Sequence, residues 1–112
     1  MVPNTRDAQN ADAMTTPGGM LGRQQFASML GEVSRRDRVA FTQLYEATSP
    51  KLYAIVLRIV RRRDLADDLL QEAYLRIWQH AGRFNPLRSS PMTWMATIAR
   101  NCALAWRQPS GI

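Results

Sequence analysis

The side chains of this sequence that could do chemistry are suited to binding rather than to catalysis. The sequence has one histidine, His80, and one cysteine, Cys102, with no cluster of metal ligands and no glycine-rich phosphate loop. An enzyme is therefore the least favoured class, and we expect neither a metal nor another cofactor. Fifteen basic residues against nine acidic ones give a formal net charge of +6 and a pI near 10.7. This excess favours a polyanionic partner, although it does not separate a nucleic acid from a membrane surface.

The charge is divided into blocks along the chain. Residues 49–63 carry a net +5, residues 64–81 a net −3 and residues 82–112 a net +4. One acidic segment between two basic ones suggests two different partners, one cationic and one anionic. Helix dipoles offer a second explanation, because acids favour helix N-termini and arginines favour helix C-termini. The charge pattern leaves both explanations open.

The acidic segment has the period of an amphipathic helix, with one apolar arc and one polar arc. The apolar arc holds Leu65, Ala66, Leu69, Leu70, Ala73, Ile77 and Ala81. The polar arc holds Asp67, Asp68, Gln71, Glu72 and Gln79, with Leu75 in its middle and Trp78 on its flank. An apolar centre with a polar rim is typical of a partner surface. Alternatively, Trp78 folds back onto the following loop and Leu75 is an ordinary exposed leucine.

The last helical segment combines basic, hydroxyl and aromatic side chains. Its predicted core arc holds Met92, Met95, Ala96, Ala99, Cys102, Ala103 and Trp106. Thr93, Thr97, Arg100 and Arg107 form an outer stripe, and Trp94 and Asn101 lie on a neighbouring one. Arginine and threonine can bind phosphates, and an exposed tryptophan can stack on an unpaired base. The alternative for Trp94 is packing against a neighbouring helix.

Helices are the elements that must position these residues, since no strand-like alternation occurs. The segment from Met1 to Gly22 is rich in helix-breaking residues and is predicted to be a disordered tail. The spacing of Phe26, Met29, Leu30 and Val33 predicts a short first helix, and Asp37 is the predicted cap of the second. Ser49-Pro50 predicts the start of a further helix, as does Asp64, whose helix runs to Ala81 before Gly82. Ser90-Pro91 starts the last helix, which runs to about Arg107.

These elements predict an all-α fold, a compact bundle of about four to five helices. The tail covers residues 1–22 and one domain covers residues 23–112. No apolar run approaches the ~20 residues of a membrane span, and the N-terminus has no signal-peptide core. A single cysteine suits a reducing compartment. We therefore expect a cytoplasmic protein without membrane insertion, monomeric by default.

Two motifs resemble those of the extracytoplasmic-function sigma factors of bacterial RNA polymerase. Residues 68–78, DLLQEAYLRIW, look like region 2.2 of that family, whose pattern is roughly D-L-x-Q-E-x-F-L-x-x-W. Residues 93–101, TWMATIARN, look like region 2.3, roughly T-W-L-x-x-I-A-R-N. Residues 41–45 and the segment 52–60 resemble region 2.1. The resemblance covers most of the chain, from about Phe26 to Arg107, with both motifs in the expected order.

The resemblance implies a non-enzymatic domain that docks on the polymerase and opens promoter DNA. The region 2.2 helix would bind the clamp coiled coil of the largest polymerase subunit, and the implied contact residues are Asp68, Gln71, Glu72, Leu75 and Trp78. The region 2.3 helix and the loop before it would hold the −10 element as a non-template single strand, with one base flipped out. The implied DNA-binding residues are Arg83, Phe84, Asn85, Arg88, Ser89, Ser90, Trp94, Thr97, Arg100 and Asn101. An anti-sigma factor is a further expected partner.

The sequence departs from the family pattern in two places. Ala105 stands where the family usually has an acid, and the sequence ends at Ile112 without the second helical domain that reads the −35 element. We therefore expect a piece that does not direct full promoter recognition alone. One alternative is a sigma-like decoy that binds an anti-sigma factor rather than DNA. A helix-turn-helix repressor fits less well, because an acidic exposed arc suits polymerase better than DNA.

Overall fold

The computed structural model describes residues 19–107, and every regular element in that range is helical. The elements are α2 (Gly19–Ser34), α3 (Arg38–Val60), α4 (Arg63–His80), the short 3₁₀ helix η3 (Ala81–Arg83) and α5 (Pro91–Arg107). The prediction of an all-α fold is confirmed. Most of the predicted tail lies outside the described residues, but α2 begins at Gly19, so its last four positions, 19–22, are helical.

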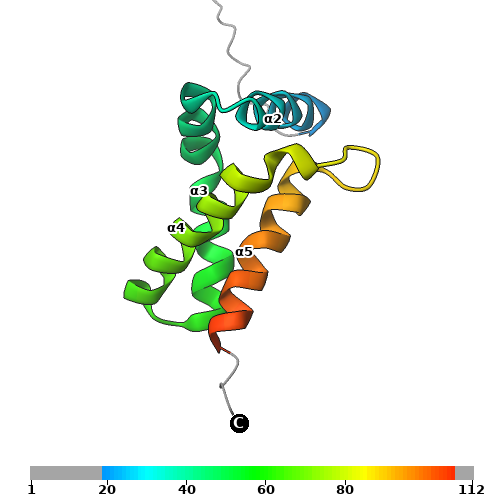
Figure 1. Ribbon diagram of the computed structural model, residues 1–112. Helices are drawn as coiled ribbons and strands as arrows, with labels where there is room; N and C mark the ends of the chain where they lie inside the picture. The colour runs from blue at the N-terminus through cyan, green and yellow to red at the C-terminus, as the bar shows by residue number, and fades with distance from the viewer. Residues whose placement is uncertain (1–18, 108–112) are drawn as a thin grey trace, which may run out of the picture.

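Three helices form the body of the bundle, and α2 lies across one end of it (Figure 1). Helices α3, α4 and α5 pack against one another, and α2 packs against α3, α5 and η3. The loop between η3 and α5 projects at the end where α2 lies (Figure 1). The largest fully buried side chains, which come from α2, α3, α4 and α5, are Leu30, Leu44, Leu52, Ile77, Met95, Val33, Val56, Thr48 and Pro91. None of the helices within residues 19–107 is long and apolar enough to cross a membrane.

Helix α3 runs through the position where a new helix was predicted. Ser49-Pro50 does not begin an element, because α3 continues from Arg38 to Val60 with Pro50 inside it. A proline in a helix interior removes one backbone hydrogen bond and costs about 3 kcal/mol. The cost is offset by packing. The buried residues recur every four positions across the proline, namely Ala40, Leu44, Thr48, Leu52, Val56 and Val60, while Pro50 itself faces solvent.

Of the three other starts that capping residues predicted, those at Asp37 and Ser90 are confirmed, and the one at Asp64 is one residue late. An Asp37 side-chain oxygen accepts a hydrogen bond from Ala40 N–H (3.1 Å), and Ser90 Oγ accepts one from Thr93 N–H (3.2 Å). Helix α4 instead begins after Arg62, which offers no side-chain cap. Asp64 lies in the first turn, where its carboxylate accepts a hydrogen bond from Arg62 (2.9 Å) that lowers the Asp64 pKa.

The far end of α5 is also more open than predicted. Met95, Ala99, Cys102 and Ala103 are buried as expected, but Trp106 is 46% exposed. The last turn of α5 lies beside the turn that joins α3 to α4, where the bundle ends (Figure 1). No described helix continues past this point to cover the indole. Burial of Trp106 would need a surface beyond the bundle, which an amphipathic period alone cannot reveal.

Candidate functional site

Four of the predicted polymerase-binding residues form one exposed face of α4, which we call the acidic face. It consists of Asp68, Gln71, Glu72 and Leu75, all exposed, with Leu75 at 53%. Glu72 accepts a hydrogen bond from Arg76 (2.9 Å), one turn later on the helix. Both side chains of this pair are about half exposed, so the pair is weak and leaves the Glu72 carboxylate accessible to a partner.

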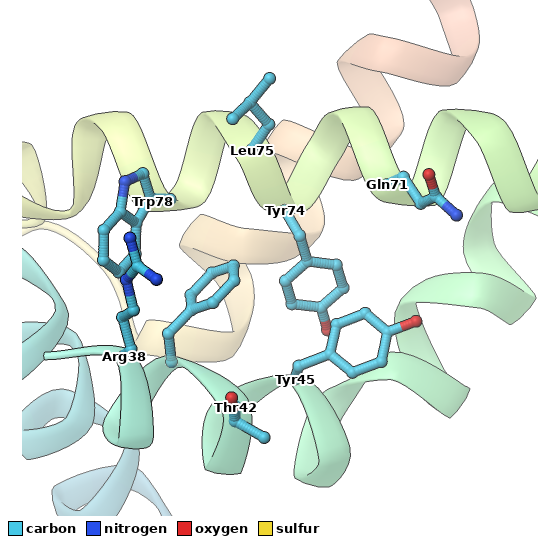
Figure 2. Close-up of a pocket in the computed structure, with 8 residues that line it drawn as sticks. Arg38, Thr42, Tyr45, Gln71, Tyr74, Leu75 and Trp78 are labelled. Atoms are coloured by element: carbon cyan, nitrogen blue, oxygen red, sulfur yellow. The ribbon is translucent and has the colours of Figure 1, made fainter. Parts of the chain in front are cut away.

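A mostly apolar groove of about 510 Å³ lies between α3 and α4, next to the acidic face. Its walls are Arg38, Phe41, Thr42 and Tyr45 from α3 and Gln71, Tyr74, Leu75 and Trp78 from α4 (Figure 2). Gln71 and Leu75 belong to both the groove and the acidic face. The α3 residues were not predicted as site residues. Their spacing over positions 38, 41, 42 and 45 is that of one helix face, but only the position of α4 makes that face a groove.

Trp78 differs from the other predicted contact residues because it is turned toward the protein. Its ring is half buried and packs edge-on against Phe41, with the centroids 5.1 Å apart. The Arg36 guanidinium lies 5.2 Å from the indole centroid and donates a hydrogen bond to the Trp78 carbonyl oxygen. Trp78 therefore closes one end of the groove, with one edge left for a partner.

Beneath the groove, a buried hydrogen-bond chain joins α3 to α4. Thr48 Oγ1 donates to the Leu44 carbonyl oxygen (2.7 Å), which uses its one proton. The Tyr74 hydroxyl, which contacts Thr48 Oγ1, must therefore be the donor in that bond. Burial of the phenol raises the Tyr74 pKa from 10.0 to about 12. The Tyr74 ring lies on Tyr45, with centroids 4.6 Å apart, and forms the floor of the groove (Figure 2).

The predicted DNA-binding loop is built by its own hydrogen bonds. Asn85 Oδ1 accepts from Leu87 N–H (2.9 Å), and the Asn85 carbonyl oxygen accepts from Arg88 N–H (2.9 Å). Asn85 thus shapes the turn in addition to any contact with a ligand. Arg83 in η3 and Arg88 in the loop are exposed, whereas Ser89 and Ser90 are half buried. Leu87, which was not predicted as a site residue, is 93% exposed at the loop.

Phe84 and Trp94 form an aromatic pair where the loop meets α5. Their ring centroids are 5.7 Å apart in an edge-to-face arrangement, and both rings are half buried against the core. The Trp94 indole therefore packs against Phe84 of the loop and against the core, and it keeps an accessible part; its stacking on a base stays a prediction. A base stacked on the remaining surface would meet a ring already fixed in orientation.

The structure places the last three predicted DNA-binding residues in two groups. Thr97 and Arg100 are exposed on the outer stripe of α5, where Thr97 Oγ1 donates to the Thr93 carbonyl oxygen (2.9 Å). Asn101 instead lines a separate cavity of about 330 Å³ with Glu72 and His80 of α4. Asn101 therefore lies closer to the acidic face than the sequence pattern indicated. Cys102 borders the same cavity, and burial raises the pKa of its thiol.

The chain matches a known family over a region that includes α4, the loop and α5. The family model for sigma-70 region 2 matches residues 44–108. An ECF RNA polymerase sigma factor SigK from Mycobacterium sp. (strain KMS) is 36% identical over 76 residues, which cover 68% of this chain and 39% of that protein. The SigK of Mycobacterium bovis (strain BCG / Pasteur 1173P2) is 30% identical over 77 residues, covering 69% of this chain and 41% of that protein. The chain thus spans about two fifths of the length of these relatives, and it belongs to the sigma-70 region 2 family of ECF sigma factors.

Proposed function

We propose that this chain is the polymerase-docking and promoter-opening domain of a sigma factor in transcription initiation. The acidic face of α4 would bind the clamp coiled coil of the polymerase's largest subunit. The loop before α5 and the outer stripe of α5 would hold the non-template strand of the −10 element. The observation that carries the proposal is the exposed acidic face, with Leu75 at its centre and the groove at its side.

The composition of this face suits a basic helical partner. Asp68 and Glu72 supply negative charge, and Gln71 supplies an amide that can both donate and accept. Leu75 and the edge of Trp78 supply apolar surface that a partner can cover. An apolar centre surrounded by polar groups is the usual layout of a protein–protein contact. The groove can additionally receive a side chain from a helix laid along α4.

Binding to the isolated clamp coiled coil tests the docking half of the proposal. Asp68→Ala and Gln71→Ala should each weaken binding about tenfold, because each removes a hydrogen-bonding group from the contact. Titration calorimetry or fluorescence anisotropy measures the dissociation constants. The matched control is Glu32→Ala, which removes an exposed acid from α2 and should leave affinity unchanged.

Two results would contradict the docking proposal. The first is a parent protein that is folded by circular dichroism and does not bind the coiled coil. The second is an equal loss in Glu32→Ala and Asp68→Ala, which would mean that net charge alone drives the association. Absence of clamp binding together with tight capture of an anti-sigma factor would favour the decoy function instead.

The DNA half of the proposal rests on cations that flank an aromatic pair. Arg83, Arg88 and Arg100 are exposed, and the Phe84–Trp94 pair lies where the loop and α5 meet. Such a surface can trap DNA that has opened thermally. Unstacking a base costs a few kcal/mol, which stacking and phosphate contacts offset. The domain would stabilise the open strand without catalysing a covalent step.

Salt dependence measures the phosphate contacts directly. Affinity for a −10 non-template oligonucleotide should fall linearly on a log–log plot against salt concentration. Arg100→Ala should reduce the slope by about 0.7, the value for one phosphate contact on a single strand. Arg35→Ala removes an exposed cation from the turn between α2 and α3 and should keep the parent slope. A flat salt response of the parent would refute the phosphate contacts.

A further inference from the structure

A second basic cavity lies at the N-terminus of α5, apart from the outer stripe. Its volume is about 240 Å³, and three helices meet around it. It is lined by Gly22, Arg23 and Phe26 of α2, Lys51 of α3, and Ser90, Pro91 and Met92 at the start of α5. We call it the basic cavity. Neither the acidic face nor the α3–α4 groove shares a residue with it.

The cavity combines positive charge with open space. Arg23 and Lys51 are exposed and come from different helices, and neither forms a salt bridge with an acid among residues 19–107. The N-terminus of α5 adds the positive end of its dipole from a third direction. Gly22 contributes no side chain, and nothing lies within 4 Å of the position that a Cβ would occupy there. Phe26 and Met92 give the walls an apolar part.

This arrangement suits a phosphodiester group better than a lone metal or an apolar ligand. Two cations that converge from separate helices can contact one phosphate, and the apolar wall can lie against a sugar or base. Within the described residues, no acidic side chain lines the cavity to repel an anion. Arg23 and Lys51 lie on separate helices that the folded bundle holds in fixed positions. The positive charge of the cavity is therefore preorganised before a ligand binds.

The position of the cavity indicates which backbone phosphate of the strand would bind in it. Ser90 lines the cavity and is also the last residue of the loop proposed to hold the −10 strand. Pro91 and Met92 continue from the loop into α5 on the cavity side. A strand that leaves the loop past Ser90 therefore reaches Arg23 and Lys51 next.

We propose that the basic cavity binds a backbone phosphate of the non-template strand just outside the −10 element. This inference rests on the proposed function, because it extends the path of the same strand. It assigns a DNA contact to α2 and to Lys51, neither of which belongs to the region 2.2 or region 2.3 motifs. The contact would tether the strand at a second point and so keep the opened DNA from closing.

One short and two long oligonucleotides separate binding at this site from binding at the loop. The short one carries only the −10 element, and the long ones extend it by four nucleotides at its 5′ or its 3′ end. One of the two extensions, the one that reaches the basic cavity, should tighten binding to the parent protein severalfold. It should also steepen the log–log slope of affinity against salt concentration by about 0.7. Arg23→Ala combined with Lys51→Ala should abolish this gain and leave affinity for the short oligonucleotide unchanged.

Two further variants control for charge and for folding. Gly22→Leu should also reduce the gain, because it fills the cavity without changing charge, and leucine favours a helix more than glycine does. Arg35→Ala should retain the full gain. Replacing the first phosphates of the extension by neutral methylphosphonates should remove the gain in the parent protein.

The outcomes distinguish this inference from the proposed function. Equal affinity for short and extended oligonucleotides, with the short one bound, overturns the basic cavity alone. No binding of any oligonucleotide overturns the proposed DNA function itself. Inorganic phosphate is titrated separately, with chemical shifts of Arg23 and Lys51 as the readout. Saturation by free phosphate, together with no gain from extension, would make this a site for a free anion and would also overturn the proposal.

Discussion

Leu70→Ala is expected to lower the free energy of unfolding by about 2.7–5 kcal/mol, whereas Leu75→Ala should change it by less than about 0.5 kcal/mol. Both residues lie on α4, and both substitutions remove the same atoms. Leu70 is 5% exposed within the core, and Leu75 is 53% exposed on the acidic face. A cavity forms only where neighbouring side chains surround the deleted atoms. Urea denaturation followed by circular dichroism measures both values.

The size of the effect of the two variants should be reversed when affinity for the clamp coiled coil is measured. Leu75→Ala removes the apolar centre of the acidic face and should weaken binding about tenfold or more. Leu70→Ala, assayed at a temperature where it remains folded, should bind like the parent because Leu70 is almost fully buried. A Leu75→Ala variant with full affinity would exclude this face as the centre of the contact.

The second large effect is an alkaline loss of stability that depends on Tyr74. Burial raises the Tyr74 pKa from 10.0 to about 12, so the unfolded chain ionises before the folded one. Stability from this group is therefore complete below pH 10 and is lost as the pH rises toward 12. A shift of this size corresponds to about 2–3 kcal/mol at the upper end of the window.

Tyr74→Phe should separate this effect from other alkaline titrations. The variant loses the hydrogen bond to Thr48 Oγ1 and should be about 1 kcal/mol less stable at neutral pH. Between pH 10 and 12 its stability should fall less steeply than that of the parent. Tyr45→Phe removes the hydroxyl of a tyrosine that is 38% exposed and should keep the steep fall. Equal slopes for the parent and Tyr74→Phe would contradict the assignment.

Signals within one or two helical turns were readable in the sequence. Asp37 and Ser90 cap their helices because a cap needs only a short side chain and an N–H three residues later. The acidic and apolar arcs of α4 likewise follow from a period of 3.6 residues. From Ala66 to Ile77 every residue of the predicted core arc is buried, and the one further buried residue of α4, Tyr74, was not on that arc. These features depend on local spacing, so they needed no knowledge of neighbouring helices.

Other features depended on which helix lies opposite. The start predicted at Ser49-Pro50 was wrong because a buried stripe at every fourth residue holds α3 together across the proline. Trp78 turns inward because Phe41 and Arg36 lie beside it. Trp106 is exposed because the bundle ends at that turn. In each case the presence or absence of a neighbour distant in sequence decides the outcome, and a single helical wheel contains no such information.

The sequence by itself determined the helical class, the two motifs and the family to which they point, since these depend on residue types at fixed spacing. Only the tertiary structure decided which surfaces those residues share. It places Phe41 and Tyr45 of α3 beside the acidic face, where they line a groove, and it places Asn101 at the same cavity as Glu72. It also gathers Arg23 and Lys51 beside Ser90. Such groupings arise when helices pack, because the angle and register between two helices are set by their buried side chains together.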